Sequence, residues 1–357
     1  VLYYQANGLP QVQIMDLSAG VTHDLSLDEE DYSVRLQGSR EWDSPILRFS
    51  YASLTTPATV YGYDMGTHQE EFRKQVQILG GFSSERYESR RVFATAADGN
   101  QIPISVLYAK DTPLDGSAPL YLYGYGSYGL IIESDFGSAR LSLVDRGYIF
   151  AIAHVRGGGE LGEKFYREGM MLKKINVAKD YLACCEHLIK KGYTYKGGLA
   201  FLGGSAGGTV GAMVANMASE LFFSMLLLVP YVDCLTTSLN DKLPLTPGEY
   251  EVFGNPKKFK EHFEYIRSYS PYNNLRSNIN YPPMFVTSSI FDSRVLYSEP
   301  IKYIAKLRAI KKPDNNLQLL KCKLKAASHG GVSGRDNSIT ELAEEYSFLL
   351  KTAGIKN

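Results

Sequence analysis

A serine flanked by glycines is the residue whose setting most directly indicates chemistry. Residues 203–207 read GGSAG, a G-x-S-x-G pattern centred on Ser205. A strand-like segment, 198–202, precedes it, and an Ala- and Met-rich helical segment, 206–220, follows it. A strand–turn–helix context with small neighbours lifts a serine hydroxyl out of a sheet, above the backbone N–H donors of the helix N-terminus. The pattern therefore predicts a nucleophilic serine.

A phosphate-binding turn is the alternative interpretation of this glycine-rich segment. Such turns need a GKS or GKT sequence, or a G-x-G-x-x-G register in front of a helix. Neither accompanies Ser205, so the sequence favours the nucleophile.

A serine nucleophile needs a base, and chain order narrows the choice among six histidines. In proteins with this motif the acid and then the histidine follow the serine. Only His262 and His329 do so here. His262 falls in a charged helical stretch and is expected to be solvated, whereas His329 lies in a small-residue loop after an apolar strand. We therefore predict His329 as the base, and a structural or supporting role for His154, which ends an earlier strand.

The orienting acid must lie between the serine and the histidine. Asp292 follows the apolar strand 284–287 by a short loop, one strand before the histidine strand. This is the position that the acid takes in the expected architecture. Asp233, after the strand that follows the nucleophile helix, is the main alternative; Asp241 and Asp314 also lie in the interval, and Asp314 is predicted to be a turn residue.

The first 75 residues are predicted to be all-β. Alternating segments at 12–17, 47–51 and 59–64 are separated by turn residues. Short strands with this spacing are typical of a sandwich or of propeller blades. The region holds material for one to two blades, whereas a propeller needs at least about four. Residues 1–75 are therefore interpreted as an incomplete propeller remnant.

From about residue 91 onward the pattern changes to strands that alternate with helices. This alternation predicts an α/β fold with a mostly parallel sheet covered on both faces. The expected strands are 92–96, 102–108, 120–123, 149–155, 198–202, 226–229, 284–287 and 317–320, and the expected helices are 176–191, 206–220, 297–310 and 339–353.

Composition limits the classes of partner. The charges of the 38 basic and 38 acidic side chains cancel, so the net charge gives no reason to expect a nucleic-acid partner. No apolar run reaches the roughly 18 residues that a membrane span needs. Four cysteines without a CxxC pair indicate a reducing compartment, so a cytoplasmic protein is expected.

Together these segments resemble prolyl oligopeptidase-type serine peptidases, most closely the oligopeptidase B group. The matching segments are 54–61, 123–129, 154–162, 203–208, 244–251, 254–256 and 268–272. The resemblance implies a β-propeller that caps an α/β-hydrolase catalytic domain, here residues 76–357. Only the C-terminal half of that arrangement is matched. Because the chain starts at Val1 without a methionine, the missing N-terminal propeller half is expected in the full-length protein.

The resemblance also implies roles for individual residues. Ser205 would be the nucleophile, His329 the general base and Asp292 its orienter. The Tyr125 hydroxyl and the backbone N–H of Ala206 would form the oxyanion hole, where donors stabilise developing negative charge. Without the resemblance, Tyr125 is a turn residue in a glycine-rich loop. No metal or cofactor is implied.

Two pairs of acidic residues bear on specificity. Glu249 and Glu251 are two residues apart, as are Glu133 and Asp135. In an extended segment such residues point the same way, so each pair is able to present two carboxylates to one cation. Two solvated surface pairs are the alternative. The resemblance implies that the first pair holds the Arg or Lys before the scissile bond, that the second pair helps with a basic residue one position earlier, and that Arg294 holds a substrate carbonyl.

The sequence thus predicts a serine-type endopeptidase that cleaves short basic peptides after Arg or Lys through an acyl-enzyme. An esterase or an acylaminoacyl-type peptidase on the same fold is one alternative. A catalytically inactive fragment or binding module is the other, because the propeller is incomplete.

Overall fold

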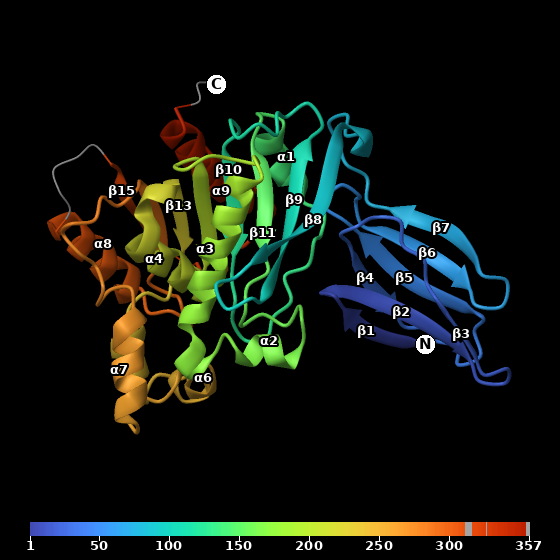
Figure 1. Cartoon of the computed structure of the whole chain (residues 1–357), viewed down its shortest axis with the longest axis horizontal. Helices are drawn as coiled ribbons and strands as arrows, with labels where there is room; N and C mark the ends of the chain where they lie inside the picture. Colours follow the sequence, from blue (N-terminus) through green and yellow to red (C-terminus); the bar gives the residue numbers. More distant parts are fainter. Residues whose placement is uncertain (311–315, 326, 355–357) are drawn as a thin grey trace.

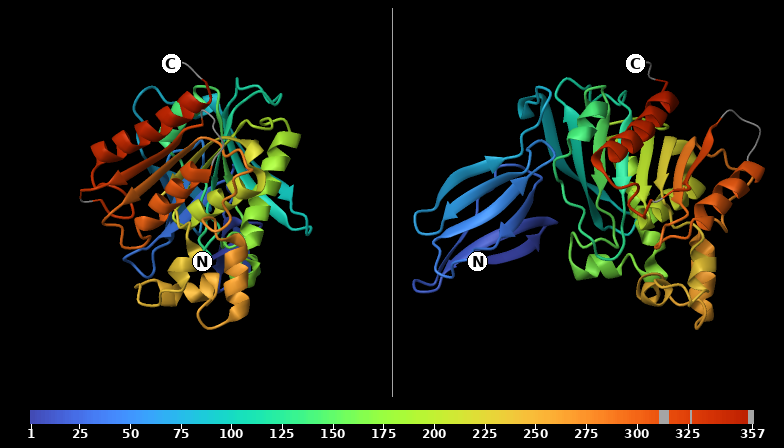
Figure 2. Two further views of the ribbon diagram at one scale, coloured as in Figure 1. Left: turned by 90° about the vertical axis from the view of Figure 1, so that its left-hand side faces the viewer. Right: turned by 180° about the vertical axis from the view of Figure 1, so that it is seen from behind.

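The N-terminal part of the chain folds as two small antiparallel sheets. The structure is a computed structural model that describes residues 1–310, 316–325 and 327–354. The first sheet contains β1 (Leu2–Ala6), β2 (Leu9–Asp16) and β3 (Val21–Asp24), and the second contains β4 (Ser33–Gln37), β5 (Ile46–Ala52), β6 (Thr59–Asp64) and β7 (Gln69–Gln75). Both sheets lie beside one edge of the main sheet (Figures 1 and 2). The predicted all-β character of this region is confirmed.

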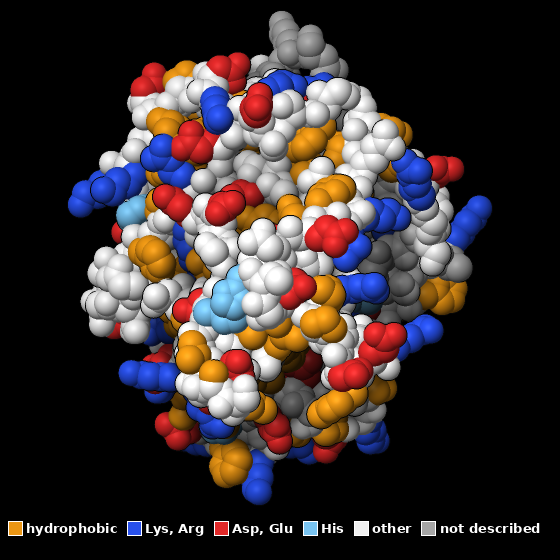
Figure 3. All heavy atoms as spheres, turned by 90° about the vertical axis from the view of Figure 1, so that its right-hand side faces the viewer, with side chains coloured by type: hydrophobic (Ala, Val, Ile, Leu, Met, Phe, Trp, Pro, Cys, Tyr) orange, Lys and Arg blue, Asp and Glu red, His pale blue; other side chains and the backbone are white. Residues whose placement is uncertain are grey.

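Alternation in these strands produces one shared core. In β2, Val12 and Ile14 are buried, and they pack in the same apolar cluster as Val34 of β4 and Phe49 of β5. Residues two apart on a strand share a face, which explains this clustering. On the outer face, acidic and basic side chains are mixed with apolar ones rather than segregated (Figure 3).

The rest of the chain builds an eight-stranded sheet. Its strands are β8 (Tyr87–Thr95), β9 (Gln101–Ala109), β10 (Leu120–Gly124), β11 (Ile149–Ala153), β12 (Leu199–Gly204), β13 (Phe222–Leu228), β14 (Met284–Ser289) and β15 (Gln318–Lys323). They lie in the order β15-β14-β13-β12-β10-β11-β9-β8. The neighbours from β11 to β15 pair in parallel, while β8 and β9 form an antiparallel hairpin at the edge. The mostly parallel sheet that the alternating pattern predicted is therefore confirmed.

Helices cover both faces of this sheet (Figures 1 and 2). On one face α3 (Ile175–Lys190), α4 (Ala206–Ala218) and α8 (Ser298–Ile310) share the larger core, and on the other α1 (Ser138–Val144) and α9 (Arg335–Thr352) share a second core. The remaining helices are α2 (Glu163–Arg167), α5 (Cys234–Ser238), α6 (Thr246–Phe253) and α7 (Lys260–Tyr269), with short 3₁₀ turns η1 (Ser84–Arg86), η2 (Met171–Lys173) and η3 (Ser219–Leu221). In the part of the chain that the structure describes, no helix combines the length and apolarity of a membrane span.

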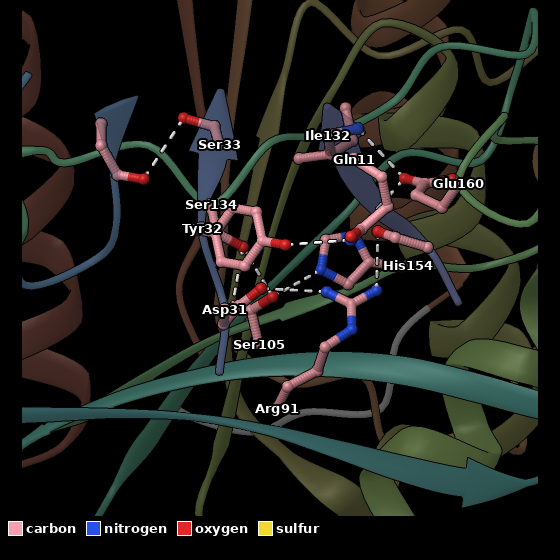
Figure 4. A network of polar contacts seen from close by, with 12 residues as sticks. Gln11, Asp31, Tyr32, Ser33, Arg91, Ser105, Ile132, Ser134, His154 and Glu160 are labelled. Carbon is pink, nitrogen blue, oxygen red and sulfur yellow. Dashed lines mark hydrogen bonds and ion pairs between the residues drawn. The ribbon is translucent and has the colours of Figure 1, made fainter. Parts of the chain in front are cut away.

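A buried polar network joins the N-terminal sheets to the main sheet (Figure 4). Asp31, which precedes β4, is fully buried and accepts hydrogen bonds from Arg91 Nη1 of β8 at 2.9 Å and from Ser134 Oγ at 2.9 Å. Ser134 contacts Ser105 Oγ at 2.8 Å, and Ser105 contacts His154 Nε2 at 2.7 Å. Buried charges are tolerated when they are paired and hydrogen-bonded. The network therefore fixes the N-terminal sheets against the hydrolase domain.

Removing the cation of this network is expected to destabilise the protein. Arg91→Met would leave the carboxylate of Asp31 buried without its cation, which costs about 3–5 kcal/mol in comparable sites. Arg90→Met is the matched control, because the Arg90 side chain is 50% exposed and pairs with Glu88 at the surface. Such a surface pair contributes about 1 kcal/mol or less. Denaturant unfolding of both variants measures the difference, and equal midpoints would contradict the assigned importance of the buried pair.

Candidate active site

Ser205 occupies a strained turn between β12 and α4. Its backbone has φ +55° and ψ −122°, a conformation that side-chain-bearing residues rarely adopt. The Ser205 N–H donates to the Leu228 carbonyl at 2.8 Å, and the Tyr231 N–H donates to the Ser205 carbonyl at 3.0 Å. Backbone hydrogen bonds on both sides therefore hold the turn in place.

The glycines around the serine are required by close packing. A Cβ on Gly207 would lie 2.6 Å from the Gly124 carbonyl oxygen, and one on Gly208 would lie 2.3 Å from Pro230 Cβ. Both separations are too short for real atoms. The small residues therefore allow the turn to pack directly against the end of β10 and the segment that follows β13.

Asp292 and His329 meet beside this turn. His329 Nδ1 lies 2.8 Å from Asp292 Oδ2, and Asp292 Oδ1 accepts the N–H groups of Arg294 at 2.8 Å and Val295 at 3.0 Å. Burial alone would raise the pKa of Asp292, but the His329 hydrogen bond and these two amides outweigh it and hold the pKa below its usual value. Asp292 is therefore an ionised partner able to orient the imidazole.

The other residues considered for these two roles lie elsewhere. Asp233 is fully buried and pairs with Lys302 instead of a histidine. His262, on α7, is half-buried rather than solvated as predicted, because its Nδ1 accepts the Asn255 N–H at 2.8 Å. The prediction for Asp314 falls outside the described residues.

Ser205 and His329 share a cavity of about 380 Å³, whose lining also includes Tyr125 and Arg294. Within the described residues, no hydrogen bond joins the Ser205 hydroxyl to the imidazole. In unliganded sites catalytic hydrogen bonds are often long and tighten only when substrate binds. The arrangement therefore brings the predicted nucleophile and the predicted base to one cavity.

Hydrogen-bond donors for an oxyanion are available at the same place. Tyr125 follows β10 and lines the cavity with Ser205. Burial, with smaller contributions from Tyr123 and Glu249, raises the pKa of Tyr125 to about 12, so its hydroxyl stays protonated near neutral pH. Ala206 is the first residue of α4, where backbone N–H groups lack intrahelical acceptors.

A second cavity of about 380 Å³ adjoins the serine and contains a carboxylate. It is lined by Ser205, Tyr125, Arg294, Tyr128 and Glu249, among others. The Tyr128 hydroxyl lies 2.9 and 3.0 Å from the two carboxylate oxygens of Glu249. Burial raises the pKa of Glu249, while the Tyr128 hydrogen bond opposes the shift. The cavity thus holds an acidic group whose described hydrogen-bond partner is a neutral phenol.

The expectation that Glu249 and Glu251 present two carboxylates to one cation is wrong. Both residues lie on α6, not on an extended segment. At 3.6 residues per turn, positions two apart point to nearly opposite sides of a helix. Glu251 accordingly lines a different groove, beside Tyr166 and Met171. The segment contains prolines and a glycine and so lacked a helical signature, although Pro247 in the first turn is compatible with a helix.

Glu133 and Asp135 do hold one cation, but it belongs to the chain itself. Arg35 Nη2 of β4 contacts Glu133 and lies 2.7 Å from Asp135 Oδ2. Neither carboxylate is among the described residues that line the two cavities at Ser205. The Arg35 side chain is 56% exposed, and such a surface ion pair is weak. This acidic pair therefore links the N-terminal sheet to the hydrolase domain.

Sequence reasoning missed several groups that the fold brings together. Tyr128 and the buried Lys174 had no recognisable motif.

A second serine–histidine–carboxylate set also exists, in which His154 contacts Ser105 at 2.7 Å and Glu160 at 3.4 Å (Figure 4). Each of these three residues is at most 2% exposed, so no substrate reaches them. The set is structural, which agrees with the role expected for His154.

The fold is that of an α/β-hydrolase domain behind a propeller segment, with a serine at the nucleophile turn. The prolyl oligopeptidase family profile matches residues 134–356, and the profile of that family's N-terminal β-propeller domain matches residues 1–76. The chain belongs to the prolyl oligopeptidase family.

Curated relatives and solved structures agree with this assignment. Dipeptidyl aminopeptidase BI of Pseudoxanthomonas mexicana is 40% identical over 99% of this chain and 48% of its own length, and Protease 2 of Moraxella lacunata is 38% identical over 98% and 50%. Oligopeptidase B from Trypanosoma brucei, solved with covalently bound antipain in a closed form, superposes with a TM-score of 0.92 at 39% identity, covering 99% of this chain and 51% of that one. The chain thus spans about half the length of these relatives.

The contact between Asp292 and His329 is expected to determine the rate at which Ser205 reacts with a fluorophosphonate. In Asp292→Asn the imidazole loses its anionic partner, and labelling of Ser205 by a fluorophosphonate is expected to slow by about 10³-fold or more. Asp241→Asn is the control, because Asp241 lies in the same interval of the chain but is exposed and pairs with Lys257. Labelling rates are measured on folded protein. Equal rates for the two variants would exclude Asp292 as the orienting acid.

Proposed function

We propose that the chain is the catalytic portion of a serine oligopeptidase that cleaves short peptides after Arg or Lys. The observation that most supports this is the position of Glu249, an acidic side chain in a cavity whose lining includes Ser205 and Tyr125. An anionic group beside a nucleophile selects substrates that carry a cation next to the bond that is broken.

In the proposed mechanism, Ser205 attacks the carbonyl after the basic residue. His329 accepts the serine proton and delivers it to the leaving amine, while Asp292 stabilises the imidazolium. The Tyr125 hydroxyl and the Ala206 N–H donate to the oxyanion of the tetrahedral intermediate. Water, activated by the same histidine, then hydrolyses the acyl-enzyme and frees the serine.

Glu249 is the proposed anchor for the cationic side chain. A guanidinium forms two parallel hydrogen bonds with a carboxylate and matches its charge. The Tyr128 hydroxyl orients this carboxylate through contacts at 2.9 and 3.0 Å. Arg294 lines both cavities at the serine and is proposed to bind a substrate carbonyl.

A role for Glu133 and Asp135 in binding a basic residue one position earlier in the substrate is also proposed. It requires the substrate cation to displace Arg35, whose contacts with the two carboxylates are partly exposed. Glu251 is proposed only as a supporting residue, because it faces a separate groove.

The whole protein is proposed to be cytoplasmic and to contain the rest of the propeller. The four cysteines are free thiols, which fits a reducing compartment. The family match over residues 1–76 is to a propeller domain, so further blades are expected in the full-length protein.

A second candidate activity is the release of amino-terminal dipeptides. The relative from Pseudoxanthomonas mexicana is named a dipeptidyl aminopeptidase, and it is 40% identical to this chain. Parallel assays of an arginyl peptide amide with a free and with an acyl-blocked amino terminus separate the two activities, since only an endopeptidase accepts the blocked form.

Replacing the nucleophile tests the proposal directly. Ser205→Ala is expected to lower kcat on an acyl-blocked arginyl coumarin amide by about 10⁶-fold, because the remaining groups cannot form an acyl-enzyme. Release of the fluorophore measures turnover, and circular dichroism confirms the fold. Retained turnover in Ser205→Ala would overturn the proposed function.

The two glutamates of α6 are expected to differ in their effect on specificity. Glu249→Gln should lower kcat/KM for an arginyl substrate by about 10- to 100-fold, the equivalent of one charge-assisted hydrogen-bonded pair. Glu251→Gln, on the opposite side of the same helix, is the matched control and should change kcat/KM by less than about threefold. A neutral norleucyl substrate should be little affected by either change. Equal losses in the two variants would contradict the specificity assigned to Glu249.

A further inference from the structure

A buried lysine lies directly behind the loop that follows β10. Lys174, which immediately precedes α3, is 0% exposed. Its Nζ donates to the Gly126 carbonyl oxygen at 2.9 Å and to Ser127 Oγ at 2.6 Å. An amine removed from water needs such partners, because burying it unpaired is costly. Both of these acceptors belong to the segment 125–128.

The same ammonium group also faces α6. Lys174 Nζ lies 4.9 Å from the centre of the Phe253 ring, close enough for a cation–π interaction. Phe253 packs edge-on against the Tyr128 ring at 6.2 Å and lies one helical turn after Glu249 on α6. Lys174 is therefore in contact with both elements that shape the carboxylate cavity.

The two acceptors lie between the two tyrosines of the cavities. Tyr125 comes just before Gly126, and Tyr128 comes just after Ser127. The amine of Lys174 thus holds the middle of the segment 125–128. One end of this segment supplies the proposed oxyanion donor, Tyr125, and the other supplies Tyr128, the partner of Glu249. Burial lowers the pKa of Lys174 to about 7, with Cys234 and Glu249 opposing the shift. Neutral or charged, the amine retains the two N–H donors that these contacts use.

The backbone of this segment is held in conformations that need support. Gly126 has φ +68°, and a Cβ there would lie 2.4 Å from Val177 of α3 and 2.9 Å from the Arg156 carbonyl oxygen. Tyr128 has φ +63°, which is uncommon for a residue with a side chain. Strained backbone persists only where the surroundings stabilise it.

We propose that Lys174 is a positioning residue that acts through the segment 125–128, aligning the Tyr125 hydroxyl for the oxyanion and Tyr128 for Glu249. The inference rests on the proposed function, because both alignments matter only if Ser205 attacks a carbonyl. Oxyanion donors act at 2.7–3.1 Å from the position of the oxygen. A misplacement of about 1 Å at such a site costs about 10²-fold in rate.

A double-mutant cycle with Tyr125 tests the proposal. Tyr125→Phe removes the donor itself and is expected to lower kcat on the acyl-blocked arginyl coumarin amide by about 10²-fold. Lys174→Met, which keeps the chain length but removes the amine, is expected to lower kcat at least tenfold. The double variant should be no slower in kcat than Tyr125→Phe within about threefold, because the route through the Tyr125 hydroxyl is expected in kcat, whereas the route through Tyr128 and Glu249 acts on binding of the substrate side chain and is expected in KM. Lys173→Met is the control, since the Lys173 side chain is 53% exposed and pairs with Glu168, and it should leave kcat unchanged.

Each outcome of the cycle has a distinct meaning. Losses that multiply in the double variant, or an unchanged kcat in Lys174→Met, overturn the positioning role. An unchanged kcat in Tyr125→Phe or in Ser205→Ala refutes the proposed function instead, whatever Lys174→Met does.

A milder variant keeps the proposal testable if Lys174→Met does not fold, as judged by thermal unfolding. Ser127→Ala retains the buried amine but removes one of its two acceptors. It is expected to lower kcat by about three- to tenfold, again without multiplying with Tyr125→Phe. Full activity of Ser127→Ala, or a multiplied loss, overturns the inference in that case.

Discussion

The close packing of the Ser205 turn is the constraint on which the rest of the site depends. A positive φ at a serine is held because the turn packs between Gly124, the last residue of β10, and Pro230, which follows β13. The carboxyl ends of parallel strands meet at one edge of a sheet. The residue after β10, the loop after β14 and the loop after β15 therefore reach the same place, and Tyr125, Asp292 and His329 come from these three connections.

The acidic residues proposed to bind substrate differ in whether a cation of the chain already pairs with them. This difference explains why their expected affinities for a substrate cation differ. Glu133 and Asp135 already contact a guanidinium, that of Arg35, so an incoming cation gains only the difference between two similar ion pairs. Glu249 is hydrogen-bonded to a phenol, which satisfies its oxygens without cancelling their charge. A carboxylate that is partly buried, oriented by a hydrogen bond and without a direct ion pair gives the larger gain when a cationic side chain enters.

Much of the fold and part of the site were predictable from the sequence, for local reasons. Period-two strands, the alternation of strands and helices, and the small residues around Ser205 all have short-range signatures. Chain order together with the strand and loop context singled out Asp292 and His329, which the structure brings within 2.8 Å of each other. The helix α6 had no such signature, because its stability comes from tertiary packing rather than from intrinsic propensity. Contacts between residues far apart in sequence, such as Arg35 with Asp135, likewise cannot be recognised from a single amino-acid sequence.

The segment that follows β10 connects the two features on which the proposed function depends. Its first tyrosine faces the serine, and its last tyrosine holds the carboxylate of α6. Between these two tyrosines, one buried amine, that of Lys174, holds the segment through Gly126 and Ser127. In the proposed function this segment connects the anchor for the cation with the oxyanion donor, because Tyr128 contacts Glu249 at one end and Tyr125 lines the cavity of Ser205 at the other. In the proposed function, binding of the basic side chain and stabilisation of the oxyanion therefore depend on the same short piece of chain.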